Sequence, residues 1–235
     1  MMAIRSALLG SALLLCSKLV FASGNDDPLL YKVMIDKAEI RHQQANNPMA
    51  LEAEAWIGKD LDKLWLKTEW VHDQDNPDEA ELELVYSRAL AAFWDLQVGW
   101  LAEINPTSGN DYLTLGFKGL APYLFEVDAS VILNNDRQIG FRLDTHYEYR
   151  FTQKLILYPE LGLEAYSRND RDAEVGKGLS NLNLGLRMRY EIRREFAPYV
   201  GITWQKAFGN TADFVRAEGQ HTTELQVVTG IQIWF

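Results

Sequence analysis

Hydrophobic and polar residues alternate along most of this 235-residue chain. In the segment 182–193, Leu, Met, Tyr and Ile occupy the even positions, while Asn, Gly, Arg and Glu occupy the odd ones. Successive side chains of a β-strand point to opposite faces, so this period of two predicts strands with one apolar and one polar face. No helical periodicity is convincing elsewhere. The alternating segments are 33–42, 51–57, 64–70, 81–86, 94–103, 112–118, 123–133, 139–151, 155–164, 182–193, 196–204 and 225–235.

The connections between these twelve segments are sorted by length. Those after even-numbered segments are tight, such as 58–62 and 193–195, whereas those after odd-numbered segments are mostly longer and polar, such as 167–178 and 208–222. Short turns at one end and long loops at the other are typical of a transmembrane barrel. A β-sandwich also alternates, but it has no reason to sort its loops in this way. The sequence therefore predicts an all-β fold: an antiparallel transmembrane β-barrel of about twelve strands, with both chain ends on the short-turn side.

The first 22 residues predict export from the cytoplasm. Arg5 precedes a short apolar run, and a small residue, Ala22, offers a cleavage site. The run is far shorter than the roughly 20 residues of a spanning helix. A lipoprotein anchor at Cys16 is the alternative, although the leucines before it lack the small residue that such a site uses. We therefore expect a signal peptide at 1–22, a short periplasmic segment at 23–30 and a barrel at 31–235, placed in the outer membrane of a Gram-negative bacterium.

Charge and cysteine content exclude several classes of function. Cleavage after residue 22 removes the only cysteine, and with it any disulfide or thiolate metal site. It also leaves 21 basic against 33 acidic residues, a formal charge of -12 in place of the -10 of the full chain. Such an acidic exported chain is a poor nucleic-acid binder and a suitable host for cations. No nucleophile with a neighbouring base is evident, since the residue two after His146 is Glu148 rather than a serine. We expect no enzyme.

If the apolar face of the barrel meets lipid, the opposite face lines the lumen and is densely charged. Buried charges must be paired or hydrated, so the simplest role of any one of them is in a network that holds the strands in register. The functional alternative is a polar path or an ion site. Twelve strands lie between the filled small barrels and the open porins, which predicts a narrow or plugged lumen. The residues expected to point inward are Glu126, Asp128, Arg142, Asp144, His146, Glu148, Arg150, Glu160, Glu164, Arg187, Arg189, Glu191 and Arg193.

Side chains that could bind a soft metal are scattered along the chain. Copper prefers Met, His and Cys ligands, and Met34, His42 and Met49 cluster around the first segment and its loop. Met188 is expected to face lipid. The candidate metal ligands are Met34, His42, Met49 and His146, with Asp144 and Glu148 as lumenal carboxylates that would draw the cation.

Several stretches resemble the copper-resistance protein B family, among them "LWLKTEW", "LVYSRALAAFWDLQVGW", "GLRMRYEIRREFAPYVG" and the closing "GIQIWF". The similarity extends from about residue 31 to 235 and is most specific at 187–201. It implies an outer-membrane barrel that contributes to copper resistance by binding or passing copper ions, with periplasmic copper-handling partners such as a multicopper oxidase.

One departure from the family pattern concerns the segment before the barrel. Members commonly carry a Met- and His-rich stretch there, whereas this chain has only "SGNDDPLL". Either copper handling then depends on the barrel itself, or the chain carries another cargo. The alternative is a general small-solute channel, or a structural barrel without metal preference.

Overall fold

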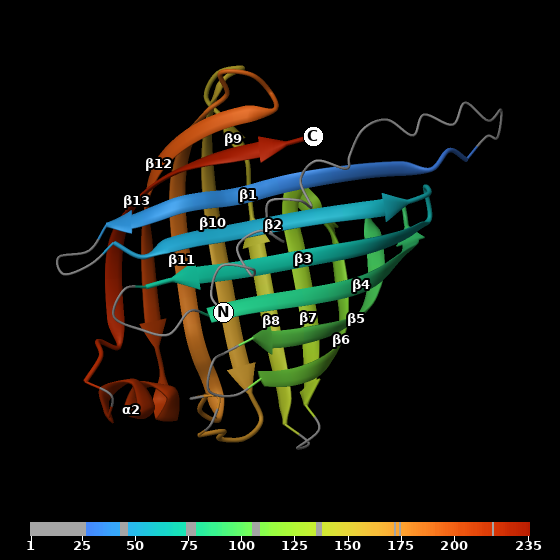
Figure 1. Ribbon diagram of the computed structural model, residues 1–235. Coiled ribbons are helices and arrows are strands. Elements are labelled where there is room, and N and C mark those ends of the chain that lie inside the picture. The colour runs from blue at the N-terminus through green and yellow to red at the C-terminus, as the bar shows by residue number, and fades with distance from the viewer. Residues whose placement is uncertain are drawn as a thin grey trace, which may run out of the picture.

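The chain folds into a closed antiparallel β-barrel (Figure 1). The computed structural model describes residues 27–42, 47–73, 79–104, 109–134, 138–171, 173, 175–217 and 219–235, so the predicted signal peptide lies outside it. β8 and β9 both pair with β10 and form one interrupted strand, which gives the twelve strands predicted from the sequence. The strands are β1 (Leu30–His42), β2 (Met49–Gly58), β3 (Asp62–His72), β4 (Glu79–Ala91), β5 (Trp94–Ile104), β6 (Gly109–Ala121), β7 (Phe125–Asn134), β8 (Ile139–His146), β9 (Tyr149–Arg150), β10 (Leu155–Tyr166), β11 (Gly178–Tyr190), β12 (Phe196–Ala207) and β13 (Thr223–Trp234).

The last residue takes part in closing the barrel. The Phe235 amide donates to the Val33 carbonyl at 2.8 Å, and the Val33 amide donates to the Phe235 carbonyl at 3.1 Å. β13 thus pairs with β1 up to the end of the chain. Because the first and last strands pair with each other, neither presents a free edge to the membrane, which is what a spanning sheet needs.

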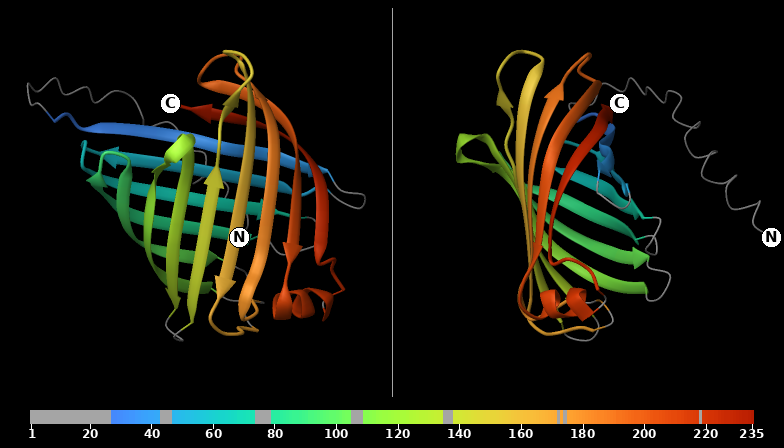
Figure 2. Two further views of the ribbon diagram at one scale, coloured as in Figure 1. Left: turned by 180° about the vertical axis from the view of Figure 1, so that it is seen from behind. Right: turned by 90° about the vertical axis from the view of Figure 1, so that its left-hand side faces the viewer.

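The two ends of the barrel differ as the loop lengths predict. The C-terminus lies at the short-turn end, and helix α2 (Gly209–Ala217) lies at the opposite, long-loop end (Figures 1 and 2). β1–β4 cross steeply in front of β10 and β11 (Figure 1). Two walls of the barrel therefore face one another across the lumen, and side chains from distant strands can meet there.

The outer surface is apolar along the middle of the strands. Leucine, isoleucine and phenylalanine side chains are exposed on this side, among them Leu66, Leu84, Leu115, Phe141 and Ile202. An exposed apolar band around a closed barrel is the surface that lipid covers. Among the described residues, no helix has the length and apolarity needed to cross a membrane.

A β-bulge in β1 changes which residues face the lumen. The register shifts between Ile35 and Lys37 against β2, and between Ile35 and Ala38 against β13. Consecutive residues Asp36 and Lys37 both line the lumen as a result. A bulge inserts one unpaired residue and redirects the side chains that follow it. This one places Lys37 within reach of the far wall.

Three details differ from the sequence-based expectation. The connection 208–222 contains α2, whose nine residues are too few to show a clear helical period; the Thr211 hydroxyl accepts from the Gly176 amide at 2.7 Å and anchors the helix. Tyr123 lies in a tight turn with φ 67 rather than in β7. Glu191 and Arg193 follow the end of β11, and Arg150 is exposed, so these three residues do not line the lumenal cavity.

Candidate functional site: the charged lumen

The barrel encloses a lumenal cavity of about 700 Å³ that is lined mainly by polar and charged side chains. Twelve carboxyl groups line it against eight Lys and Arg side chains, a formal excess of four negative charges. An enclosed surface with one excess sign of charge raises the local concentration of the opposite ion. The cavity therefore favours cations.

Ion pairs connect the two walls across the lumen. Lys67 on β3 lies 3.0 Å from Asp128 on β7, and the Arg142 guanidinium on β8 donates to both oxygens of Glu81 on β4 at 3.0 and 3.3 Å. In each case three strands separate the partners in the sheet. The lumen is therefore crossed by side chains of both walls.

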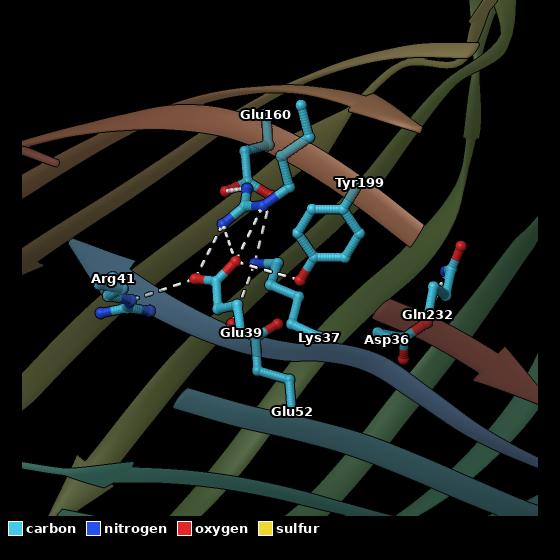
Figure 3. A network of polar contacts seen from close by, with 9 residues as sticks. Asp36, Lys37, Glu39, Arg41, Glu52, Glu160, Tyr199 and Gln232 are labelled. Atoms are coloured by element: carbon cyan, nitrogen blue, oxygen red, sulfur yellow. Dashed lines mark hydrogen bonds and ion pairs between the residues drawn. The ribbon is translucent and has the colours of Figure 1, made fainter. Parts of the chain in front are cut away.

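The most buried charges form a cluster around Glu39 (Figure 3). Arg187 on β11 donates two hydrogen bonds to Glu39 Oε2 on β1, at 2.9 and 3.1 Å, and a third pairs it with Glu160 on β10. The Tyr199 hydroxyl and the Arg41 guanidinium complete the shell of Glu39, each at 3.1 Å. The Glu39 side chain is 0% exposed and that of Arg187 is 4% exposed. Charges this dry persist only when every one of them is paired.

Glycines opposite the cluster give its side chains room to lie against the wall. Gly230 is the cross-strand partner of both Tyr199 and Glu39, and a Cβ atom there would lie 2.6 Å from the Tyr199 hydroxyl. Gly201 lies opposite Arg187 in the same way, and a Cβ atom would lie 2.8 Å from the Arg187 Cγ. Glycine within a strand often marks such a close approach. Gly201 and Gly230 therefore leave the space that the Arg187 and Tyr199 side chains occupy.

A second cluster is built on lysines. Asp128 Oδ2 accepts from Lys67 Nζ at 3.0 Å and lies 3.9 Å from Lys118 Nζ. Glu83 Oε2 lies 3.6 Å from Lys67, and Glu54 lies 3.4 Å from Lys118. These five side chains are 18% to 27% exposed, so water reaches all of them, whereas Glu39 and Arg187 at the centre of the other cluster are almost dry.

A row of carboxylates crosses four neighbouring strands near the long-loop end. Glu52 pairs in register with Glu69, Glu69 with Glu81, and Glu81 with Glu103. We call these four residues the glutamate row. This row was not predicted, since all the charges expected to point inward lie in the second half of the chain. The signal was present, because Glu52 and Glu81 alternate with leucines and alanines in their segments.

The candidate metal ligands separate into two groups. Met34, Asp144, His146 and Glu148 line the lumenal cavity, with His146 Nε2 3.1 Å from Glu126 and its ring stacked on Tyr158. His42 and Met49 lie at the long-loop rim, outside the cavity lining of the described residues.

At that rim, His42 contacts the Thr229 hydroxyl at 3.0 Å and Met49 lies opposite His72 in the β2–β3 ladder. Across the part of the chain that the structure describes, no three or more His, Cys, Asp or Glu side chains converge as a metal-holding group.

Comparison with known proteins shows the family of this chain. A family model described as copper resistance protein B precursor (CopB) matches residues 29–235. The chain belongs to this family. Copper resistance protein B of Escherichia coli is 35% identical over 211 residues, which cover 90% of this chain and 71% of that relative. A copper resistance protein B homolog of Pseudomonas syringae pv. tomato is 33% identical over 200 residues, 85% of this chain and 68% of that relative.

Solved structures confirm the architecture. The NanC porin superimposes with a TM-score of 0.57 and the KdgM porin with 0.53, each at 12% identity and over 87% of this chain and 99% of the porin. At such low identity the likeness concerns the fold alone. The protein is thus an outer-membrane β-barrel of the copper resistance protein B family.

Proposed function

We propose that this barrel contributes to copper resistance by binding copper ions or passing them across the outer membrane. The observation that carries the proposal is the excess of four carboxyl groups in the lumenal cavity of a copper resistance family member. Copper is the cargo in this proposal, and no catalytic step is assigned to any residue. The partners are outer-membrane lipid and a periplasmic copper-handling protein such as a multicopper oxidase.

The two ends of the lumen have different roles in copper handling. The glutamate row lies on β2–β5 toward the long loops, where carboxylates attract cations without demanding a particular metal. Met34 near the start of β1 and His146 at the end of β8 line the cavity toward the short turns. Thioether and imidazole ligands favour copper over hard cations such as Mg²⁺. In this order, the carboxylates would concentrate the ions, and Met34 and His146 would select among them.

Ion flux into liposomes tests the proposal. The full chain is reconstituted in liposomes that contain a copper-responsive dye, and external CuCl₂ is added. We expect copper entry well above that of protein-free liposomes, and a fall of about fivefold or more in the triple variant Glu52→Gln, Glu69→Gln, Glu81→Gln, because the local cation concentration drops. Asp213→Asn is the matched control, since Asp213 is an exposed carboxylate on α2. Copper entry no faster than in empty liposomes would contradict the proposal.

A second pair of variants separates copper handling from general solute passage. Met34→Leu with His146→Gln removes both soft ligands and preserves the approximate size of each side chain. We expect slower copper entry with unchanged Mg²⁺ entry. An equal effect on the two ions would favour the general small-solute channel.

A further inference from the structure

The two cross-lumen clusters differ in the kind of cation that holds them. In the Glu39 cluster the central cation is Arg187, which is buried and donates several hydrogen bonds in a fixed geometry. In the lysine cluster the cations are Lys67 and Lys118, each 18% to 27% exposed to the lumen. A guanidinium forms planar, multidentate pairs, whereas an ammonium is a hydrated point charge on a flexible stem. The ion pairs of the arginine cluster are therefore the more rigid ones, and those of the lysine cluster are easier to break.

Each lysine ammonium occupies a position between two carboxylates. Lys67 Nζ lies between Asp128 and Glu83, at 3.0 and 3.6 Å. Lys118 Nζ lies between Glu54 and Asp128, at 3.4 and 3.9 Å. The carboxylates belong to β2, β4 and β7, so the cluster spans the lumen between the two walls. These are positions that a mobile cation in the lumen would otherwise take.

We propose that Lys67 and Lys118 act as tethered counter-ions: they close the lumen to monovalent ions, and a divalent cation displaces them from Asp128. The inference rests on the proposed function only in treating the lumen as a path for cations. Two ammonium groups share one oxygen of Asp128, and their mutual repulsion weakens both contacts. A divalent ion attracts the same carboxylate with twice the charge of either lysine, so it competes where K⁺ does not.

The wall beside Lys118 accommodates the displaced side chain. Its ammonium lies 4.8 Å from the centroid of the Trp65 ring, which in turn packs against Trp56 with a centroid separation of 5.9 Å. The face of an indole attracts a cation. Lys118 can therefore leave Asp128 and keep a favourable contact without leaving the lumen.

Single-channel recording in planar bilayers tests the inference. The full chain is compared with the double variant Lys67→Met, Lys118→Met in KCl, and then with MgCl₂ added at constant ionic strength. We expect low conductance of the wild type in KCl and a clear rise with Mg²⁺. We expect the double variant to conduct about twofold or more above wild type already in KCl, because the barrier and two positive charges are gone, and to respond little to Mg²⁺.

A second variant and a control keep the result interpretable. Asp128→Asn removes the carboxylate that both ammonium groups share, and each keeps one other carboxylate, Glu83 or Glu54. The lumen then carries one negative charge less, so the reversal potential in a KCl gradient should shift toward anions, whereas loss of the two lysine charges in the double variant should shift it toward cations. A purely structural role of the cluster would lower the folded yield of both variants without opposite shifts in selectivity. Lys154→Met with Lys177→Met removes two exposed lysines and should match the wild type.

Equal conductance of wild type and double variant in KCl, including silence of both, would overturn the inference. The recordings in planar bilayers contain no copper. Their outcome is therefore independent of whether copper enters liposomes, and either proposal can fail without the other.

Discussion

Arg187 on β11 and Glu39 on β1 form an ion pair of 2.9 Å across two intervening strands, with both side chains almost completely withdrawn from water. The pair connects strands from opposite ends of the chain on the inside of the barrel. Burying two charges is costly, and the geometry compensates only while both partners are present. Removal of one partner should therefore destabilise the barrel more than removal of both.

Removing one partner should destabilise the barrel strongly. For Arg187→Met we expect a loss of about 3–5 kcal/mol in the free energy of unfolding, because the buried Glu39 loses its main partner and keeps only Arg41 and the Tyr199 hydroxyl. Arg187→Met combined with Glu39→Met should cost less than the sum of the two single variants. Reversible urea unfolding in phospholipid vesicles measures these differences. Arg216→Met is the control, since its pair with Asp213 is exposed and should matter by less than about 1 kcal/mol. Additive losses would show that the two residues act independently.

The close contact at Gly230 predicts a steric effect at a second position. Gly230→Ala would place a methyl group 2.6 Å from the Tyr199 ring and 2.7 Å from the Ala38 carbonyl, and the backbone atom cannot move away. We expect a loss of about 1–3 kcal/mol from overpacking.

Gly162→Ala is the matched control for this substitution. It also faces a lumenal side chain, but the nearest atom is the Asp144 Oδ1 at 3.0 Å, at the end of a flexible side chain. The same urea titration should show a clearly smaller loss of unfolding free energy for Gly162→Ala. Equal losses at both glycines would contradict the close packing of Tyr199 against Gly230.

The strands of this barrel were predictable because each one carries its own signal. Alternation along 182–193 requires no knowledge of any other strand, and the same holds for the other eleven segments. The lengths of the connections then predicted which end of the barrel carries the short turns and which the long loops. The helix α2 was missed because its pattern is only nine residues long and includes Gly, Asn and Thr.

The contacts across the lumen were not predictable in the same way. Lys67 and Asp128 are 61 residues apart, and their meeting depends on strand tilt, on register and on how the two walls face each other. The bulge that turns Lys37 inward is also invisible to a strict period of two. The alternating pattern was enough to predict which side chains point inward. Their partners across the lumen could be identified only from the closed barrel.

The terminal aromatic residue predicts an assembly phenotype. Phe235 pairs with Val33 through its backbone and is 72% exposed, at the end where the short turns lie. Deleting Phe235 removes both the last pair of hydrogen bonds and the aromatic ring, so we expect a lower yield of folded barrel in the outer membrane. Heat-modifiable mobility on gels measures the folded fraction. Phe235→Ala keeps the backbone pair, and its comparison with the deletion separates the two contributions. Normal assembly of the truncated chain would contradict a role for this residue.

The lipid-facing surface predicts a depth-dependent cost for charge. Leu115 lies in the middle of β6 between Val98 and Val131, with 47% of its surface exposed on the outer face. Leu115→Arg should lower the free energy of unfolding in bilayers by about 2–4 kcal/mol, because an arginine at the bilayer midplane cannot be hydrated fully. Leu61→Arg is the matched control: Leu61 is 57% exposed but lies in the short turn between β2 and β3, where the cost should be about 0–1 kcal/mol. Unfolding in vesicles compares the two. Equal costs at both positions would mean that β6 does not cross the hydrocarbon at this level, and the orientation of the barrel in the membrane would have to be revised.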